Sequence, residues 1–252
     1  MLEHTFQTPV PLSFEVSIPS GDIDVETVDG DETHLTVDGD ENLLEQVEIR
    51  QDGNRVAITM RGKNKIGFSF SLGSLMWGND GLRVRATVPH GADVKVKTAS
   101  GDTQVEGRAG RLEVNSASGD LRVRGTADDV TVKTVSGDVE VERVGGNLSV
   151  QCVSGDVRSG VVGGSVDTKS VSGDIRLEGV SAGDVRFASV SGDIEIGVAS
   201  GSVLDVDAGS TSGDLTSEVP LGSERPIGVG EAAPTIVLRG RTVSGDVRVF
   251  RA

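Results

Sequence analysis

The triplet Ser-Gly-Asp recurs along the chain and constrains the fold more than any other feature. Five of the triplets follow one another at intervals of 18 residues. A unit this short cannot bury a hydrophobic core alone, so the spacing indicates units that stack on one another. The triplets begin at Ser20, Ser100, Ser118, Ser136, Ser154, Ser172, Ser191, Ser212 and Ser244.

The same pattern repeats at half this period. Written in nines from Ser100, most segments open with a small or turn-forming pair and carry apolar residues at positions 4, 6 and 9, as Val139, Val141 and Val144 do. Positions 4 and 6 lie on one face of a β-strand, and the spacing lacks the 3.6-residue period of a helix. We therefore predict an all-β fold, a parallel β-helix or β-solenoid. Each coil would have the 18 residues of the repeat, as two nine-residue half-coils, and position 9 would seal the corners.

One continuous domain with three regions is expected. No proline occurs between positions 90 and 219, as an uninterrupted ladder of central strands requires. Residues 1–91 read as a less regular β region with early coils at 20–28 and 29–37, a helical turn near 41–46, a hairpin over 47–59 and an apolar loop. Residues 92–219 form the regular solenoid, and 220–252 form a loop and a C-terminal capping coil.

Net charge and the absence of targeting signals limit the partners and the cellular location that we expect for the protein. With 24 basic and 39 acidic residues the net charge is −15, which excludes a nucleic-acid partner because no basic surplus can replace phosphate counterions. No run approaches the ~20 apolar residues of a spanning helix, and no basic and apolar leader begins the chain. We expect a cytoplasmic protein without direct membrane insertion. Surface exposure would need an export route that the sequence does not display.

The cysteine, the histidines and the serines of the sequence give little support for an enzymatic function. A single cysteine, Cys152, excludes an intrachain disulfide and reads as a small strand residue. The three histidines, His4, His34 and His90, lie before the regular repeats and lack the spacing of metal ligands. No histidine is therefore placed to activate the serines of the triplets. We predict that the protein is not an enzyme and carries no cofactor.

The triplet aspartates are the candidate metal ligands. Stacked coils would align them along one edge, where neighbouring carboxylates repel. Either hydrogen bonds within each turn relieve this repulsion, with glycine supplying a positive φ, or cations such as calcium bind along the row. The known calcium-binding nonapeptide repeat shares the period of nine but not the glycine and aspartate pattern. The candidate ligands are Asp102, Asp120, Asp138, Asp156, Asp174, Asp193 and Asp214.

One apolar segment of the N-terminal region is the candidate partner-binding site. Residues 65–77 hold three of the seven aromatic side chains. This segment either caps an open end of the solenoid against end-to-end pairing or is an exposed apolar loop that meets a protein partner or a membrane surface. Self-association of the protein is a further possibility. Its candidate binding residues are Phe68, Phe70, Leu72, Leu75, Met76 and Trp77.

The recurring Val-Ser-Gly-Asp-Val-x-Val series resembles a family already described. Segments 135–141, 171–177 and 243–249, together with 21–25 and 84–89, are similar to the bacterial β-strand-repeat domain of unknown function that carries the label "putative adhesin". The resemblance covers about residues 10–250 and implies the solenoid fold, no catalytic residues and an association with envelope-related systems.

Taken with the residues, this resemblance predicts a non-enzymatic structural or interaction module, such as a scaffold or sensor in an envelope-associated system. The alternatives are a surface adhesin, a self-assembling β-helical scaffold resembling the bactofilins, and a cation-binding solenoid.

Overall fold

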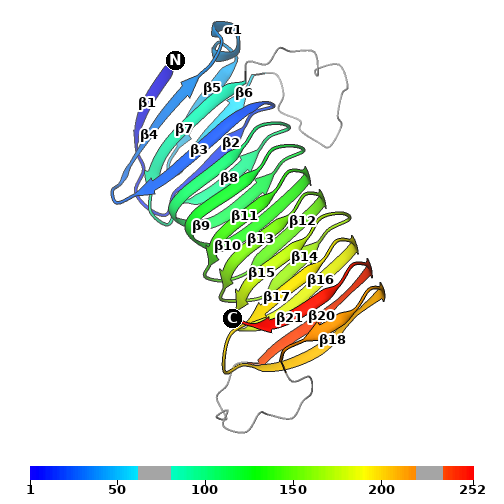
Figure 1. Ribbon diagram of the computed structural model, residues 1–252. Helices are drawn as coiled ribbons and strands as arrows, with labels where there is room; N and C mark the ends of the chain where they lie inside the picture. The colour runs from blue at the N-terminus through cyan, green and yellow to red at the C-terminus, as the bar shows by residue number, and fades with distance from the viewer. Residues whose placement is uncertain (62–80, 220–234) are drawn as a thin grey trace.

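Two stacked layers of short strands form the molecule, which is described here from a computed structural model (Figure 1). The structure describes residues 1–61, 81–219 and 235–252. All strands belong to one continuous sheet that wraps around the core, because two long strands, β9 (Thr103–Asn115) and β10 (Leu121–Ser136), run through both layers. The only described helix is α1 (Glu41–Leu44), one turn whose N-cap Asp40 accepts the Asn42 N–H.

The first layer consists of the strands that follow the Ser-Gly-Asp triplets, together with β1, β4 and β7 at the N-terminal end. Hydrogen bonding connects them, from the N-terminal end of the stack, in the order β1, β4, β7, β3, β9, β10, β11, β13, β15, β17, β21, β19. Apart from β9 and β10 these are β1 (Leu2–Gln7), β4 (Glu32–Asp38), β7 (Leu82–Pro89), β3 (Gly21–Val28), β11 (Val139–Val144), β13 (Val157–Val162), β15 (Ile175–Val180), β17 (Ile194–Val198), β21 (Val247–Arg251) and β19 (Leu215–Ser217).

The second layer consists of the strands that precede the triplets, together with the β5–β6 hairpin at the N-terminal end. The order is β5, β6, β2, β8, β9, β10, β12, β14, β16, β20, β18. The additional strands are β5 (Val47–Asp52), β6 (Arg55–Met60), β2 (Ser13–Ser17), β8 (Asp93–Lys97), β12 (Leu148–Ser154), β14 (Val166–Lys169), β16 (Gly183–Ser191), β20 (Thr235–Ser244) and β18 (Val203–Ser212).

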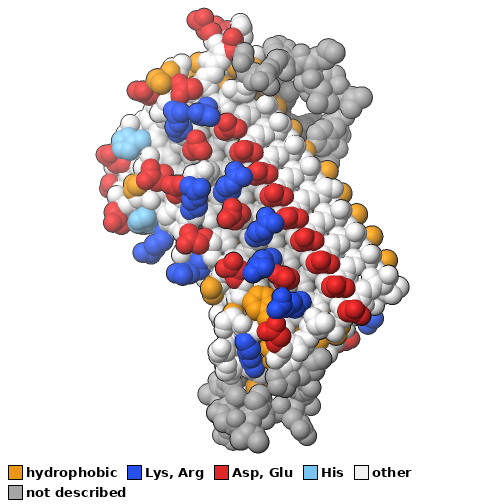
Figure 2. Space-filling model, viewed as in Figure 1, with side chains coloured by type: hydrophobic (Ala, Val, Ile, Leu, Met, Phe, Trp, Pro, Cys, Tyr) orange, Lys and Arg blue, Asp and Glu red, His pale blue; other side chains and the backbone are white. Residues whose placement is uncertain are grey.

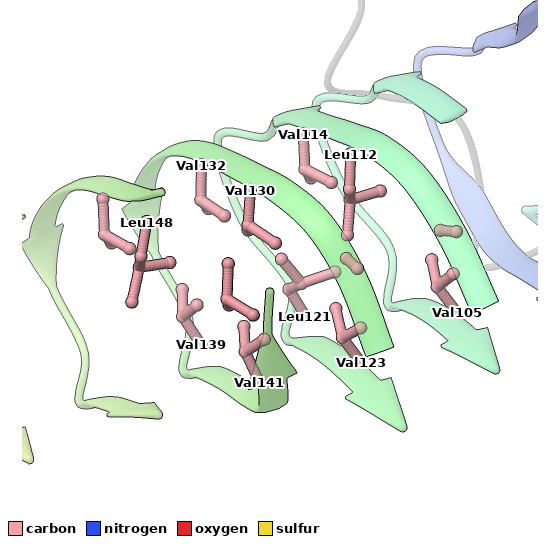
Figure 3. Close-up of a cluster of buried hydrophobic side chains, with 14 of the residues drawn as sticks. Val105, Leu112, Val114, Leu121, Val123, Val130, Val132, Val139, Val141 and Leu148 are labelled. Carbon is pink, nitrogen blue, oxygen red and sulfur yellow. The ribbon is translucent and has the colours of Figure 1, made fainter. Parts of the chain in front are cut away.

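Parallel pairing confirms the predicted all-β fold with its mostly parallel sheet. In the regular region parallel partners are 18 positions apart, as Leu121 is from Val139 and Val130 is from Leu148. The core lies between the two layers, where side chains at positions 4 and 6 of each half-coil point inward and interdigitate (Figure 3). The predicted hairpin is confirmed as β5–β6, which pair antiparallel.

Glycine in the triplet turn is required twice over. Gly137 has φ +121°, and a Cβ built on it would lie 2.2 Å from the carbonyl oxygen of Gly119 in the neighbouring coil. An L-residue would strain the backbone and collide with a fixed main-chain atom. The glycines of neighbouring triplets stack on one another in this way, so successive triplet turns pack this closely only with glycine at this position.

Both ends of the stack differ from the predicted order. The C-terminal strands β20 and β21 do not cap the solenoid, since they lie between β16–β17 on one side and β18–β19 on the other. Hydrophobic burial explains this arrangement: Ile236, Leu238, Val247 and Val249 are fully buried, whereas Leu215 of the outer coil is 38% exposed. The more apolar coil therefore occupies the inner place.

The N-terminal end follows the same rule. Strands β2 and β3, rich in buried apolar side chains such as Phe14 and Ile23, lie between β8–β9 and β6–β7. The predicted early coil at 29–37 is wrong. That segment forms β4, which runs antiparallel to β7 and to β1, because the turn at 29–31 sends the chain back along the same layer rather than across to the other.

Candidate interaction surface

One corner of the solenoid carries all nine Ser-Gly-Asp triplets, and we call it the Ser-Gly-Asp edge. The serines of successive triplets form parallel bridges along it, as Ser100 does with Ser118 and Ser118 with Ser136. In Figure 2 the edge is visible as a diagonal row of acidic side chains with hydrophobic side chains beside it along the right-hand outline.

The triplet aspartates form a continuous ladder along this edge. In each step one carboxylate oxygen, Oδ1, accepts the backbone N–H of the aspartate in the next coil. The N···O distance is 2.9 Å from Asp120 to Asp102, from Asp138 to Asp120 and from Asp156 to Asp138. This aspartate ladder runs in the spatial order Asp22, Asp102, Asp120, Asp138, Asp156, Asp174, Asp193, Asp246 and Asp214.

The ladder corrects two expectations about these carboxylates. Their hydrogen bonds join neighbouring coils instead of closing each turn on itself, and Asp246 lies between Asp193 and Asp214. The second oxygen, Oδ2, accepts an arginine donor at three rungs, from Arg83 at 3.2 Å, from Arg122 at 2.9 Å and from Arg158 at 2.8 Å.

Metal ligation by the ladder stays a prediction. Within residues 1–61, 81–219 and 235–252, no group of three or more histidine, cysteine, aspartate or glutamate side chains is arranged to hold a metal ion. The structure therefore aligns the seven predicted ligands on one edge without gathering them around a common centre.

Five valines form an exposed row beside the aspartate ladder. They occupy position 9 of the half-coils that directly precede a triplet, and they are between 43% and 52% exposed. This exposure corrects the expectation that position 9 seals this corner. At the opposite corner position 9 is buried, with Val144 1% and Val180 0% exposed. The valine row consists of Val135, Val153, Val171, Val190 and Val243.

Strand parity explains why the two corners differ. Before each triplet, positions 4, 6 and 8 point inward in strict alternation, so position 9 must point outward. The inward residue at position 8 is a serine or threonine in most coils, and in five of them its hydroxyl donates to the carbonyl two residues on, as Thr134 donates to Ser136 at 3.2 Å. At the other corner two consecutive residues, Glu142 and Arg143, point outward, and this shift returns position 9 to the core.

Sequence reasoning missed the column of hydroxyl side chains at position 8, although a serine or threonine recurs there in the sequence. Cys152 occupies position 8 in one coil and is 4% exposed. It lies in β12, as expected for a small residue within a strand. Its burial, together with the charges of Asp138 and Asp156, raises the pKa of the Cys152 thiol, against a lowering by a backbone hydrogen bond at Ser154. A raised pKa disfavours the nucleophilic thiolate.

A basic column flanks the valine row on the side away from the aspartates. It consists of position 7 of the half-coils that precede the triplets, which is two positions before each valine of the row, and it contains no acidic residue along eight stacked positions. From β8 to β18 its members are Lys97, Asn115, Lys133, Gln151, Lys169, Ala188, Arg241 and Gly209. Each coil of the valine row thus presents, across the corner, a basic or neutral residue, a valine and an aspartate.

A second feature lies near the N-terminal end of the first layer. A depression of about 350 Å³ opens over β3, β7 and β9, and Asp24, Glu26, Arg85 and Glu106 are among the residues lining it. Carboxylates and one guanidinium on a flat sheet give it mixed charge without an enclosed apolar wall, unlike most small-molecule pockets.

The predicted partner-binding residues Phe68, Phe70, Leu72, Leu75, Met76 and Trp77 lie outside the described residues. No helix among the described residues is long and apolar enough to cross a membrane.

Three solved structures from Parabacteroides and Bacteroides species have the same fold. A protein titled "putative lipid binding protein" from Parabacteroides distasonis superposes with a TM-score of 0.57 at 16% identity, over 98% of this chain and 96% of its own. A "putative adhesin" from the same species gives 0.55 at 15% identity, covering 98% and 97%. A "putative adhesin" from Bacteroides fragilis gives 0.55 at 13% identity, covering 98% and 96%.

Identities this low support the fold and not a shared ligand. A comparison with curated protein sequences gives no match. The family model described as Toastrack DUF4097 matches residues 12–250, nearly the whole chain, and agrees with the resemblance seen in the Val-Ser-Gly-Asp-Val-x-Val series. The chain therefore belongs to the toastrack DUF4097 family.

Proposed function

We propose that this protein is a non-enzymatic interaction module, a β-solenoid with the 18 residues of the sequence repeat in each coil, that binds a macromolecular partner along its Ser-Gly-Asp edge. The observation that carries the proposal is the valine row. Five side chains of one apolar type, each about half exposed, follow one another in register over the coils that bear them. Scattered exposed valines need no explanation, whereas a contiguous apolar row with charged flanks is typical of an interaction surface.

Catalysis has no comparable support. The one cysteine is buried with a raised thiol pKa, and the described histidines lie at the N-terminal end. His34 contacts Thr5 and His90 contacts Thr27, so neither approaches the serines of the edge. A Ser-His pair of the kind that activates a nucleophile is not formed among the described residues.

A role in an envelope-associated system, as a scaffold or sensor, is part of the same proposal and rests on the family. The solved neighbours titled as adhesins favour surface attachment as the second candidate. Cell fractionation separates the two: an adhesin is exposed to protease added to intact cells, whereas an internal scaffold is protected until the cells are lysed.

Site-specific photo-crosslinking in living cells tests the interaction surface. A photoreactive residue placed at Val153, 43% exposed on the valine row, is compared with the same residue at Val161, 44% exposed at the opposite corner. We expect a discrete crosslinked species from position 153 and none from position 161. Equal yields at both positions, or no species from position 153, would overturn the proposal.

Cation binding is a separate alternative with a simple assay. Calcium bound to the aspartate ladder would raise the melting temperature as the calcium concentration rises, since it would bind the folded state alone. Melting curves with calcium and with a chelator, superimposed within error, would remove this alternative and leave the interaction proposal intact.

A further inference from the structure

We infer that the partner on the Ser-Gly-Asp edge is a second copy of this chain, joined side by side and parallel, with valine row against valine row. This inference rests on the proposed function, because it identifies the occupant of that surface. Two observations favour a second copy: the repeat distance of the row and the order of charges across it.

The repeat distance favours another solenoid. Neighbouring strands in a sheet are ~4.8 Å apart, so the valines recur along the edge at that interval. Side chains on one face of an extended strand recur at ~6.6 Å, and one helical turn rises 5.4 Å, so either would lose register within a few coils. A second stack of the same coils stays in register along the whole row.

Charge order selects the relative orientation of the two copies. Across one coil the edge presents Lys133, then Val135, then Asp138, and the coil two steps further presents Lys169, then Val171, then Asp174. A two-fold axis parallel to the stack, through the contact between the rows, places each lysine of one copy opposite the aspartate of the same coil in the other. A two-fold axis across the stack would place lysine on lysine and aspartate on aspartate, which repel.

The parallel arrangement also pairs the basic residues of the valine row with aspartates. Basic residues flank the row at three coils, where the aspartates of the same coils face them across the two-fold axis. The pairs are Lys133 with Asp138, Lys169 with Asp174, and Arg241 with Asp246. Oδ1 of each of these aspartates accepts a ladder hydrogen bond, and Oδ2 accepts none from the described residues, so it is available to a second donor.

A dimer of this kind is expected to be weak and reversible. The contact is a ridge about one side chain wide, below the standard size of a stable interface of roughly 800 Å² per partner. The net charge of −15 on each copy opposes association at low salt, and at physiological ionic strength the Debye length of ~8 Å screens this repulsion. Association should therefore depend on protein concentration and be measured near physiological salt.

Sedimentation equilibrium of the full chain over a wide concentration range provides the test. We expect a monomer–dimer equilibrium that Val153→Asp weakens at least about tenfold, because the two introduced carboxylates meet on the two-fold axis. Val161→Asp is the matched control, at equal exposure on the opposite corner, and should leave the dimer unchanged. Circular dichroism and thermal melting establish that both variants fold.

Disulfide trapping tests the parallel orientation. In a Cys152→Ser background, Val135→Cys should form a symmetric disulfide with itself, since each coil meets its own counterpart. Mixed Val135→Cys and Val171→Cys chains should not link to each other. A mixed disulfide in preference to symmetric ones would overturn the parallel arrangement.

The outcomes separate this inference from the proposed function. A monomer at all concentrations, or a dimer insensitive to Val153→Asp, overturns self-association. If photo-crosslinking from position 153 then yields a species other than two copies of this chain, the interaction module stands with a different partner. If that crosslink is also absent, both proposals fail.

Discussion

Asp138 provides the sharpest test of how the edge is stabilised. Its Oδ1 accepts the Asp156 N–H at 2.9 Å, while its charge faces Asp120 and Asp156 in the neighbouring coils. Asp138→Asn keeps an oxygen acceptor and removes the charge, whereas Asp138→Ala removes both. The two substitutions therefore separate the hydrogen bond from the repulsion.

The magnitudes decide which effect dominates. Two carboxylates ~5 Å apart repel by ~0.8 kcal/mol in a water-like dielectric, so two neighbours give ~1.7 kcal/mol. A Debye length of ~8 Å roughly halves this at physiological salt, leaving ~0.9 kcal/mol. A hydrogen bond to a charged acceptor contributes ~1.5–3 kcal/mol when sheltered, and the lower end applies to this exposed edge.

We expect Asp138→Asn to change the free energy of unfolding by no more than ~0.5 kcal/mol, because relief of repulsion offsets the weaker neutral acceptor. Asp138→Ala should destabilise the protein by about 1 kcal/mol relative to Asp138→Asn, a difference of ~2–4 °C in melting temperature for a chain of this size. Urea unfolding at low and at high salt measures both. If the alanine variant equals or exceeds the asparagine variant in stability, the ladder hydrogen bond does not stabilise the edge.

Three further predictions concern packing, pH and thiol chemistry. A Cβ on Gly240 would lie 2.5 Å from the Phe187 ring, so Gly240→Ala should cost ~1–3 kcal/mol, and adding Phe187→Leu should recover part of it in a double-mutant cycle. Burial tends to raise the pKa of Glu15, but hydrogen bonds from Arg55 and Lys97 outweigh it, so the folded-state pKa lies below 4.5. Glu15 therefore stabilises the fold above pH 4.5 and loses this contribution as pH falls through the folded value. Glu15→Gln should cost ~1–2 kcal/mol in thermal melts at neutral pH and little in acid. Ellman's reagent should label Cys152 at least about tenfold more slowly in the native protein than in denaturant, and equal rates would contradict its burial and raised thiol pKa.

The regular part of the fold could be predicted because every coil obeys the same local rules. The period of 18, the inward positions 4 and 6, and glycine at the turn each follow from strand geometry and backbone sterics, and Val139, Val141 and Gly137 lie where those rules place them. The exposure of Val153 could not be predicted from an average nonamer. It depends on whether the corner that follows carries the triplet, because there strict alternation through position 8 leaves position 9 facing outward.

The order of the outer coils could not be predicted from the sequence for a related reason. A strand such as β21 presents the same alternation as β17 or β19, so its pattern does not specify its neighbours. Burial of the more apolar coil decides the order, and that is a property of the assembled stack. The aspartates were found from the triplet, whereas their partners across coils depend on the stacking itself.

The inner position of β20 and β21 has a consequence for synthesis of the protein. Strands β18 and β19 leave the ribosome first, and β16 and β17 then present the free edge that β20 and β21 later occupy. Because the coils are alike, β18 and β19 can dock there in parallel register before their proper neighbours exist. Completion of the fold then requires that this early pairing be released and the later coil inserted, a kinetic trap produced by the repeat itself. Similarity between coils thus stabilises the finished stack and slows its final assembly.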